Sequence, residues 1–79
     1  MKKLILYSTL GCHLCDLAVD EVEPCLTNTS FSLEKIDIAD DLDLLKQYGT
    51  SIPVLFSPEI DSALYWPFDS MAVKRFLSK

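Results

Sequence analysis

The sequence predicts a small α/β domain with a four-stranded mixed sheet flanked by three helices. The first observation is that short apolar runs, typical of strands, alternate with longer stretches whose apolar residues recur at the three- and four-residue spacing of amphipathic helices. The second is the order of these segments: strand, helix, strand, helix, strand, strand, helix. A helix between the first two strands makes them parallel, and a hairpin of the last two adds antiparallel strands.

Composition restricts the classes of function. The 79 residues suit a single domain, expected over residues 1–79, and 49% hydrophobic with 24% charged residues is typical of a globular chain. The net charge is −5 and no basic cluster exists beyond the lysine and arginine pairs at residues 2–3 and 74–75, so we expect no binding to nucleic acid or membranes. The three cysteines include a single close pair, which favours a reducing, cytoplasmic compartment over a secreted disulfide framework. A monomer is expected.

The first strand and helix are predicted from their apolar patterns. Leu4 to Tyr7 is continuously apolar, which predicts a strand buried on both faces. From His13 onward, apolar residues recur at helical spacing and acidic residues lie largely opposite them. These apolar positions are Cys15, Ala18, Val19, Val22 and Leu26. Pro24 should kink or end the helix, and residues 27–30 are rich in turn formers.

The second strand and helix follow this turn. Residues 31–38 alternate at first between apolar and polar, which predicts a strand near the sheet edge. Asp40 is predicted to cap the next helix, with Asp41 and Asp43 in a first turn where negative charge is favourable. The positions predicted to be buried are Leu42, Leu45 and Tyr48. Gly49 is predicted to end the helix.

Two short strands and a helix complete the chain. Residues 54–56, led by Pro53, predict a third strand, and residues 63–66 return as the second strand of a hairpin. Asp69 is predicted to cap the last helix. Its apolar positions are Ala72, Val73, Phe76 and Leu77. The aromatic side chains before this helix are expected to pack against the core: Tyr65, Trp66 and Phe68.

The segment Gly11-Cys12-His13-Leu14-Cys15 places two cysteines three positions apart at the first turn of a helix that follows a strand. This is the arrangement of a dithiol redox site. Cys12 would lie where free backbone N–H groups and the positive end of the helix dipole favour a thiolate. Cys15 would lie one turn along, close enough to form a disulfide.

His13 and Gly11 are the candidate modulating residues. Lowering a thiol pKa by two units requires roughly 2.7 kcal/mol, whereas a helix N-terminus supplies at most about 2 kcal/mol. The negative charge of Asp16 disfavours the thiolate, so a cationic His13 beside Cys12 is the candidate to supply the rest of the free energy. The alternative is that His13 points to solvent and only shapes the surface.

The order of elements, with a Cys-x-x-Cys after the first strand and Ile52-Pro53 opening the third, resembles the thioredoxin fold in its minimal, glutaredoxin-like form. Residues 6–15 are similar to the active-site segment of short bacterial glutaredoxin-like proteins, and residues 51–56 to the cis-proline segment of that family. The resemblance covers essentially the whole chain. It implies a cis bond between Ile52 and Pro53, a position of Pro53 beside the two thiols, and a substrate backbone held against Ile52.

The expected activity is thiol–disulfide exchange in cell redox homeostasis, with Cys12 as the nucleophile and Cys15 as the resolving thiol. Expected partners are a disulfide-containing protein or a low-molecular-weight thiol, and a reductase of unknown identity. We expect no resident cofactor or metal, and glutathione is one candidate electron donor. The resemblance does not extend to glutathione binding: His13-Leu14 stands where the family usually has Pro, and residues 66–68 replace its Gly-Gly turn.

Other functions stay open at this point. The domain could be a binding or adaptor module whose cysteines are vestigial. A closed zinc site needs four ligands, and the chain offers one cysteine pair plus His13 and Cys25. An iron–sulfur cluster shared between two copies, each contributing Cys12, resembles what some glutaredoxins do. Cys25 itself is expected to be a buried structural residue.

Overall fold

A computed structural model describes residues 2–78, and it confirms the predicted order of elements. The strands are β1 (Lys2–Ser8), β2 (Phe31–Asp37), β3 (Val54–Ser57) and β4 (Ser62–Tyr65). The helices are α1 (His13–Val22), α2 (Leu42–Tyr48) and α3 (Ser70–Leu77), with short 3-10 helices η1 (Glu23–Leu26) and η2 (Ile38–Asp40). Within the described residues, no helix has the length and apolar character needed to span a membrane.

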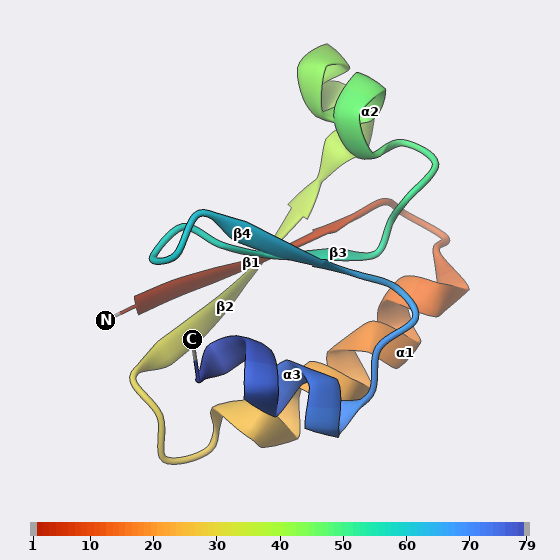
Figure 1. Cartoon of the computed structure of the whole chain (residues 1–79). Helices are drawn as coiled ribbons and strands as arrows, with labels where there is room; N and C mark the ends of the chain where they lie inside the picture. The colour runs from red at the N-terminus through yellow and green to blue at the C-terminus, as the bar shows by residue number, and fades with distance from the viewer. Residues whose placement is uncertain (1, 79) are drawn as a thin grey trace.

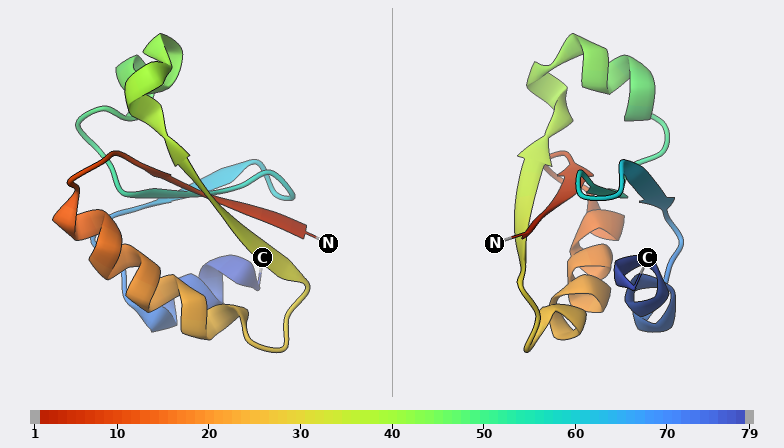
Figure 2. Two further views of the ribbon diagram at one scale, coloured as in Figure 1. Left: turned by 180° about the vertical axis from the view of Figure 1, so that it is seen from behind. Right: turned by 60° about the vertical axis from the view of Figure 1, so that its left-hand side comes forward.

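The four strands form one sheet in the order β2-β1-β3-β4, with α1 and α3 on one face and α2 on the other (Figures 1 and 2). β1 runs parallel to β2 and antiparallel to β3, and β3 pairs antiparallel with β4. The mixed sheet is therefore the one predicted. β2 lies at an edge, as its alternating pattern indicated.

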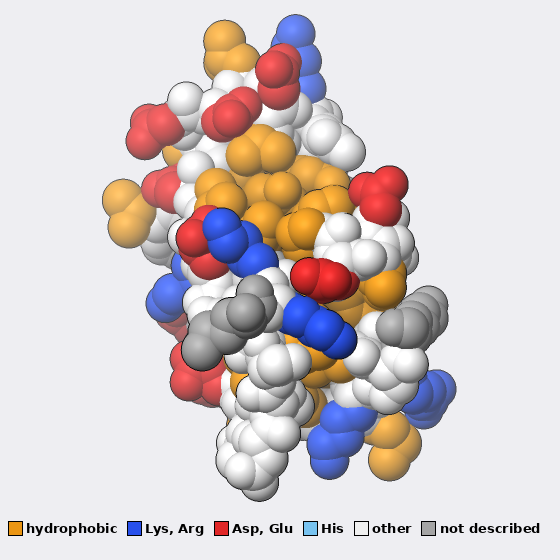
Figure 3. All heavy atoms as spheres, turned by 90° about the vertical axis from the view of Figure 1, so that its left-hand side faces the viewer, with side chains coloured by type: hydrophobic (Ala, Val, Ile, Leu, Met, Phe, Trp, Pro, Cys, Tyr) orange, Lys and Arg blue, Asp and Glu red, His pale blue; other side chains and the backbone are white. Residues whose placement is uncertain are grey.

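Each face of the sheet has its own apolar cluster. The cluster beneath α1 and α3 includes Leu4 and Leu6 of β1, both fully buried. The opposite face carries Tyr7, Ile38, Tyr48 and Val54. α2 lies over one end of that face, and Figure 3 shows hydrophobic side chains gathered there among charged ones. The alternation of side chains along β1 thus divides its apolar run between two clusters.

Tyr7 and Tyr48 join the sheet to α2. Their rings stack with centroids 4.8 Å apart, and both side chains are buried. Burial raises the pKa of each tyrosine above its ordinary value of 10.0, because the charged phenolate loses its contact with water. The negative charge of Asp41 raises the pKa of Tyr7 further.

The start of α2 differs from the prediction. Asp41, not Asp40, caps the helix: its Oδ1 accepts hydrogen bonds from the backbone N–H groups of Asp43 and Leu44, at 3.0 and 3.1 Å. Asp41 has the extended backbone that a capping residue requires, with φ of −125°. Asp40 is instead the last residue of η2.

The buried side of α2 also differs. Tyr48 is buried as predicted, but Leu42 and Leu45 are 74% and 43% exposed. The helix has seven residues and reaches the core through Leu44 and Tyr48, which are one turn apart. The prediction of Leu42 and Leu45 as core residues is therefore wrong.

The ends of the other helices agree with the sequence. α1 ends at Val22, and Pro24 lies in the η1 helix that follows, because proline lacks the N–H that would continue an α-helix. Asp69 caps α3, and its Oδ1 accepts a hydrogen bond from the N–H of Ala72 at 2.8 Å.

The aromatic side chains before α3 pack only in part. Phe68 is buried and packs edge-on against half-buried Trp66, whereas Tyr65 is 53% exposed.

Candidate functional site: a cysteine pair at the start of a helix

The loop from β1 to α1 positions the first cysteine. Gly11 has a left-handed backbone, with φ of +76°, which glycine adopts without steric cost. The N–H of Cys12 donates a hydrogen bond to the carbonyl oxygen of Thr9 at 3.3 Å, closing the turn. The chain therefore leaves the end of β1 and reverses directly into α1.

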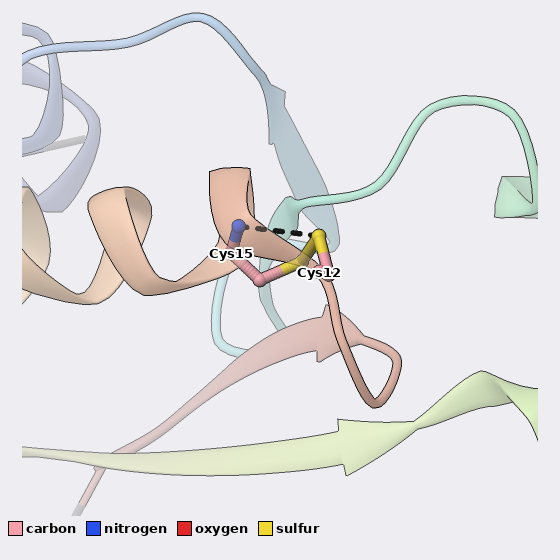
Figure 4. The surroundings of a disulfide bond; sticks show 2 residues. All are labelled: Cys12 and Cys15. Carbon is pink, nitrogen blue, oxygen red and sulfur yellow. Dashed lines mark hydrogen bonds between the residues drawn. A yellow bond between two sulfur atoms is a disulfide. The ribbon is translucent and has the colours of Figure 1, made fainter.

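Cys12 and Cys15 are joined by a disulfide, with their Cα atoms 5.3 Å apart (Figure 4). Cys12 is the N-cap of α1, and the backbone N–H of Cys15 donates a hydrogen bond to Cys12 Sγ at 3.2 Å. The first-turn N–H groups of a helix lack partners within the helix, and here one of them points at a sulfur atom. When the pair is reduced, such a donor favours the thiolate form of Cys12.

The two sulfur-bearing residues differ in accessibility. Cys15 is 5% exposed, whereas Cys12 is half-buried and its neighbours His13 and Leu14 are exposed. A molecule that approaches from solvent therefore reaches Cys12 first. His13 lies at the first position of α1, next to Cys12 and open to solvent.

The Ile52–Pro53 segment lies at the same end of β1. Tyr7 of β1 pairs with Val54 of β3 in an antiparallel register, so Pro53 lies beside the point where the chain leaves β1 for Cys12. The Ile52–Pro53 peptide bond is cis, Pro53 is buried and Ile52 is half-buried. A second cis bond, between Trp66 and Pro67, was not predicted.

A hollow of about 280 Å³ opens on the other side of the cysteine pair, between α1 and β2. Its charged lining comes from Asp16 of α1 and from Lys35 and Asp37 of β2. The remaining lining residues are Ser8, Thr9, Leu10, Gly11, Cys12, Cys15 and Val19.

The β2 residues of this hollow were missed at the sequence level. Lys35 and Asp37 pair with Leu6 and Ser8 of β1 in the parallel register. They continue the alternation that begins with Phe31 and Leu33, so they lie on the sheet face that α1 covers. The spacing of two along β2 was the signal that could have found them.

Cys25 is buried and free, as predicted. Its Sγ lies 3.4 and 3.3 Å from the carbonyl oxygens of Glu21 and Ser70, and the single thiol proton is donated to this pair of acceptors. Among residues 2–78, no three His, Cys, Asp or Glu side chains group closely enough to hold a metal ion.

Comparisons with known proteins agree with this geometry. Residues 3–78 match the family model of a glutaredoxin-like domain (DUF836). A search of curated proteins gave no significant match.

Solved structures similar to this chain are small proteins of the same architecture. The X-ray structure of protein XcR50 from X. campestris is 36% identical, with a TM-score of 0.80 and 95% of each chain covered. The solution structure of XcR50 has a TM-score of 0.82 over 99% of this chain and 94% of the other, at 35% identity. Protein Ne2328 from Nitrosomonas europaea is 30% identical, with a TM-score of 0.80 over 95% of this chain and 89% of the other.

Proposed function

Because this chain belongs to the glutaredoxin-like domain family, we propose that it is a thiol–disulfide oxidoreductase with Cys12 and Cys15 as its reactive pair. The observation that supports this function best is the Cys12–Cys15 disulfide at the N-terminus of α1. A pair that can close a disulfide within one helical turn can also accept and return electrons by exchange with another disulfide.

The reaction begins with the reduced pair. The Cys12 thiolate attacks one sulfur of a substrate disulfide, a bond forms between the two sulfurs, and the other substrate sulfur leaves as a thiolate that takes up a proton. Cys15 then loses its proton and attacks Cys12 Sγ, which closes the Cys12–Cys15 disulfide and releases the second substrate thiol. The substrate gains two electrons from the cysteine pair and two protons, one from Cys15 and one from the solvent, into which Cys12 had released its own on forming the thiolate.

The structure supports separate roles for the two cysteines. Cys12 is the more accessible and accepts the N–H hydrogen bond from Cys15, so it suits the attacking role. Cys15 is buried and one turn away, so it suits an attack within the same chain. Pro53 and Ile52 lie at the same end of the sheet and suit the substrate-positioning role.

The setting we propose is a reducing, cytoplasmic one, in which a separate reductase returns the pair to its dithiol form. The substrate is a disulfide-containing protein or a low-molecular-weight thiol in its oxidised form. Three cysteines with one buried and free are consistent with that compartment.

A test of the proposal is reduction of insulin disulfides with dithiothreitol as electron source. The parent protein should accelerate the reaction, and the variants Cys12→Ser and Cys15→Ser should lose that acceleration. Cys25→Ala is the matched control, because Cys25 is buried away from the pair, and it should retain activity. A parent protein no faster than dithiothreitol alone would exclude this function and favour a binding module.

The direction of electron flow requires a second measurement. The reduction potential of the pair is titrated against a glutathione buffer. A value of about −270 mV would indicate a reductase, and a value of about −120 mV would indicate an oxidant.

A further inference from the structure

Three exposed leucines lie on the segment that carries the cysteine pair, and we refer to Leu10, Leu14 and Leu17 as the apolar rim. Their side chains are 89%, 45% and 40% exposed. Leu10 lines the hollow beside Cys12, and Leu14 lies between the two cysteines in sequence. Exposed leucines contribute little to folding, so their presence on both sides of Cys12 in the chain favours a surface that binds a partner.

The position of Leu14 and Leu17 on α1 can be fixed from a contact further along the helix. Leu14, Leu17 and Glu21 are spaced by three and four residues, so they follow one side of α1. Glu21 accepts hydrogen bonds from Ser70, the first residue of α3. This side of α1 therefore faces the start of α3 at Glu21, yet both leucines, nearer the cysteine pair, are open to solvent.

The charges around the pair restrict what can bind there. The hollow beside Cys12 contains the carboxylates of Asp16 and Asp37 and the ammonium of Lys35, and the whole chain has a net charge of −5. Glutathione carries more carboxylates than amines, so the field of this protein opposes its approach. The same field does not oppose the approach of a neutral polypeptide, and it attracts a basic one.

We propose that the apolar rim selects polypeptide disulfides whose cysteine is flanked by apolar and basic residues, in preference to glutathione disulfide. The proposal rests on the dithiol function above and names its substrate class. The apolar side chains of the polypeptide pack on the leucines and hold its disulfide over Cys12. The Cys12 thiolate then attacks the peptide sulfur, the second sulfur leaves with the electron pair of the broken bond, and Cys15 closes the pair by releasing the peptide thiol.

The test compares one leaving group on three carriers. A neutral chromogenic pyridyl thiol is joined by a disulfide to each of three carriers. The first is glutathione, and the second is a peptide with leucine and lysine beside its cysteine. The third is a peptide of equal length with serine and aspartate beside its cysteine. The reduced protein is mixed with each, and the second-order rate constant of chromophore release is measured. The leucine–lysine peptide should react at least about tenfold faster than the other two.

Variants of the rim then test its role. In the double variant Leu10→Ser/Leu17→Ser, the ratio of rate constants for the leucine–lysine peptide and glutathione should fall by about tenfold. Both leucines are exposed, so the fold should tolerate the change. Leu42→Ser is the matched control, since Leu42 is exposed on α2 and lies outside the rim, and its ratio should equal that of the parent.

Two kinds of result would overturn the proposal, and they can be told apart. Equal rates for the three carriers, a preference for glutathione, or a double variant with the parent ratio would exclude selection by the rim while leaving the dithiol chemistry intact. Release no faster than that of Cys12→Ser from every carrier would remove the proposed function itself.

Discussion

Glu21, in the last turn of α1, accepts hydrogen bonds from both the backbone N–H and the hydroxyl group of Ser70, the first residue of α3. The distances to Glu21 Oε1 are 3.0 and 3.3 Å, and the two residues are 49 positions apart in sequence. The carboxylate lies at the positive end of α3, where negative charge is favourable. This contact joins the two helices that cover the same face of the sheet and keeps α1, which carries the cysteine pair, fixed against α3.

Replacing Glu21 with Ala should lower the free energy of unfolding by about 1–2 kcal/mol, because two hydrogen bonds to a charged group are lost. Urea denaturation measures the change. Glu23→Ala is the control, since Glu23 is exposed, and it should change stability by no more than about 0.5 kcal/mol. Equal losses in the two variants would show that the Glu21–Ser70 contact contributes nothing.

Replacing Gly11 with Ala should lower the free energy of unfolding by about 1 kcal/mol through the backbone alone. The left-handed φ of +76° disfavours any side chain, whereas a Cβ at this position would meet no other atom within 4 Å. Gly11→Asn should cost less, because asparagine tolerates this conformation. Chemical denaturation of both variants checks the order, and an equal or larger loss for Gly11→Asn would point to a clash in place of backbone strain.

Replacing His13 with Ala should decrease the fraction of Cys12 present as thiolate at neutral pH and make the disulfide harder to reduce. His13 directly follows Cys12 at the first position of α1, where a positive charge on the side chain would stabilise the thiolate. Thiolate absorbance of the reduced protein during a pH titration measures the effect. His13→Lys should restore most of it, and an unchanged titration in His13→Ala would assign His13 to the surface only.

Stability should decrease in alkaline solution because of Tyr7 and Tyr48. Burial raises the pKa of both phenols in the folded state, so their contribution to stability is complete below the unfolded pKa of about 10. It is lost as the pH rises through the higher folded values. Urea denaturation at increasing pH should show the decline, and Tyr48→Phe should reduce its slope; a slope identical to that of the parent would contradict this account.

Much of the fold could be predicted because strong local signals agree with the packing. Four local signals each have one physical interpretation: the apolar run of β1, the helical spacing after His13, the break at Pro24 and the cap at Asp69. The spacing of Cys12 and Cys15 at the start of a helix likewise predicted a pair close enough to bond.

The wrong predictions concern α2, where neighbouring residues have the same kind of side chain. Asp40 and Asp41 have identical side chains, and the choice between them depends on the backbone path out of η2, which the sequence does not contain. Leu42 and Leu45 have the apolar character of core residues, but α2 lies at one end of the sheet and has only one narrow side against it. The contact between Glu21 and Ser70 joins distant segments and leaves no local pattern to detect.

The position of Cys25, apart from the other two cysteines, limits how many disulfides each chain can form. Cys25 is buried, its thiol is hydrogen-bonded to backbone carbonyl oxygen, and it lies in η1 beyond the far end of α1 from the Cys12–Cys15 pair, so Cys12 is the sulfur that an oxidant reaches first. Oxidation of the native molecule should therefore stop at one bridge per chain, with the loss of two hydrogen atoms visible in intact mass. Alkylation of the native reduced protein should label Cys12 first, and the two buried thiols, Cys15 and Cys25, should react fully only after denaturation.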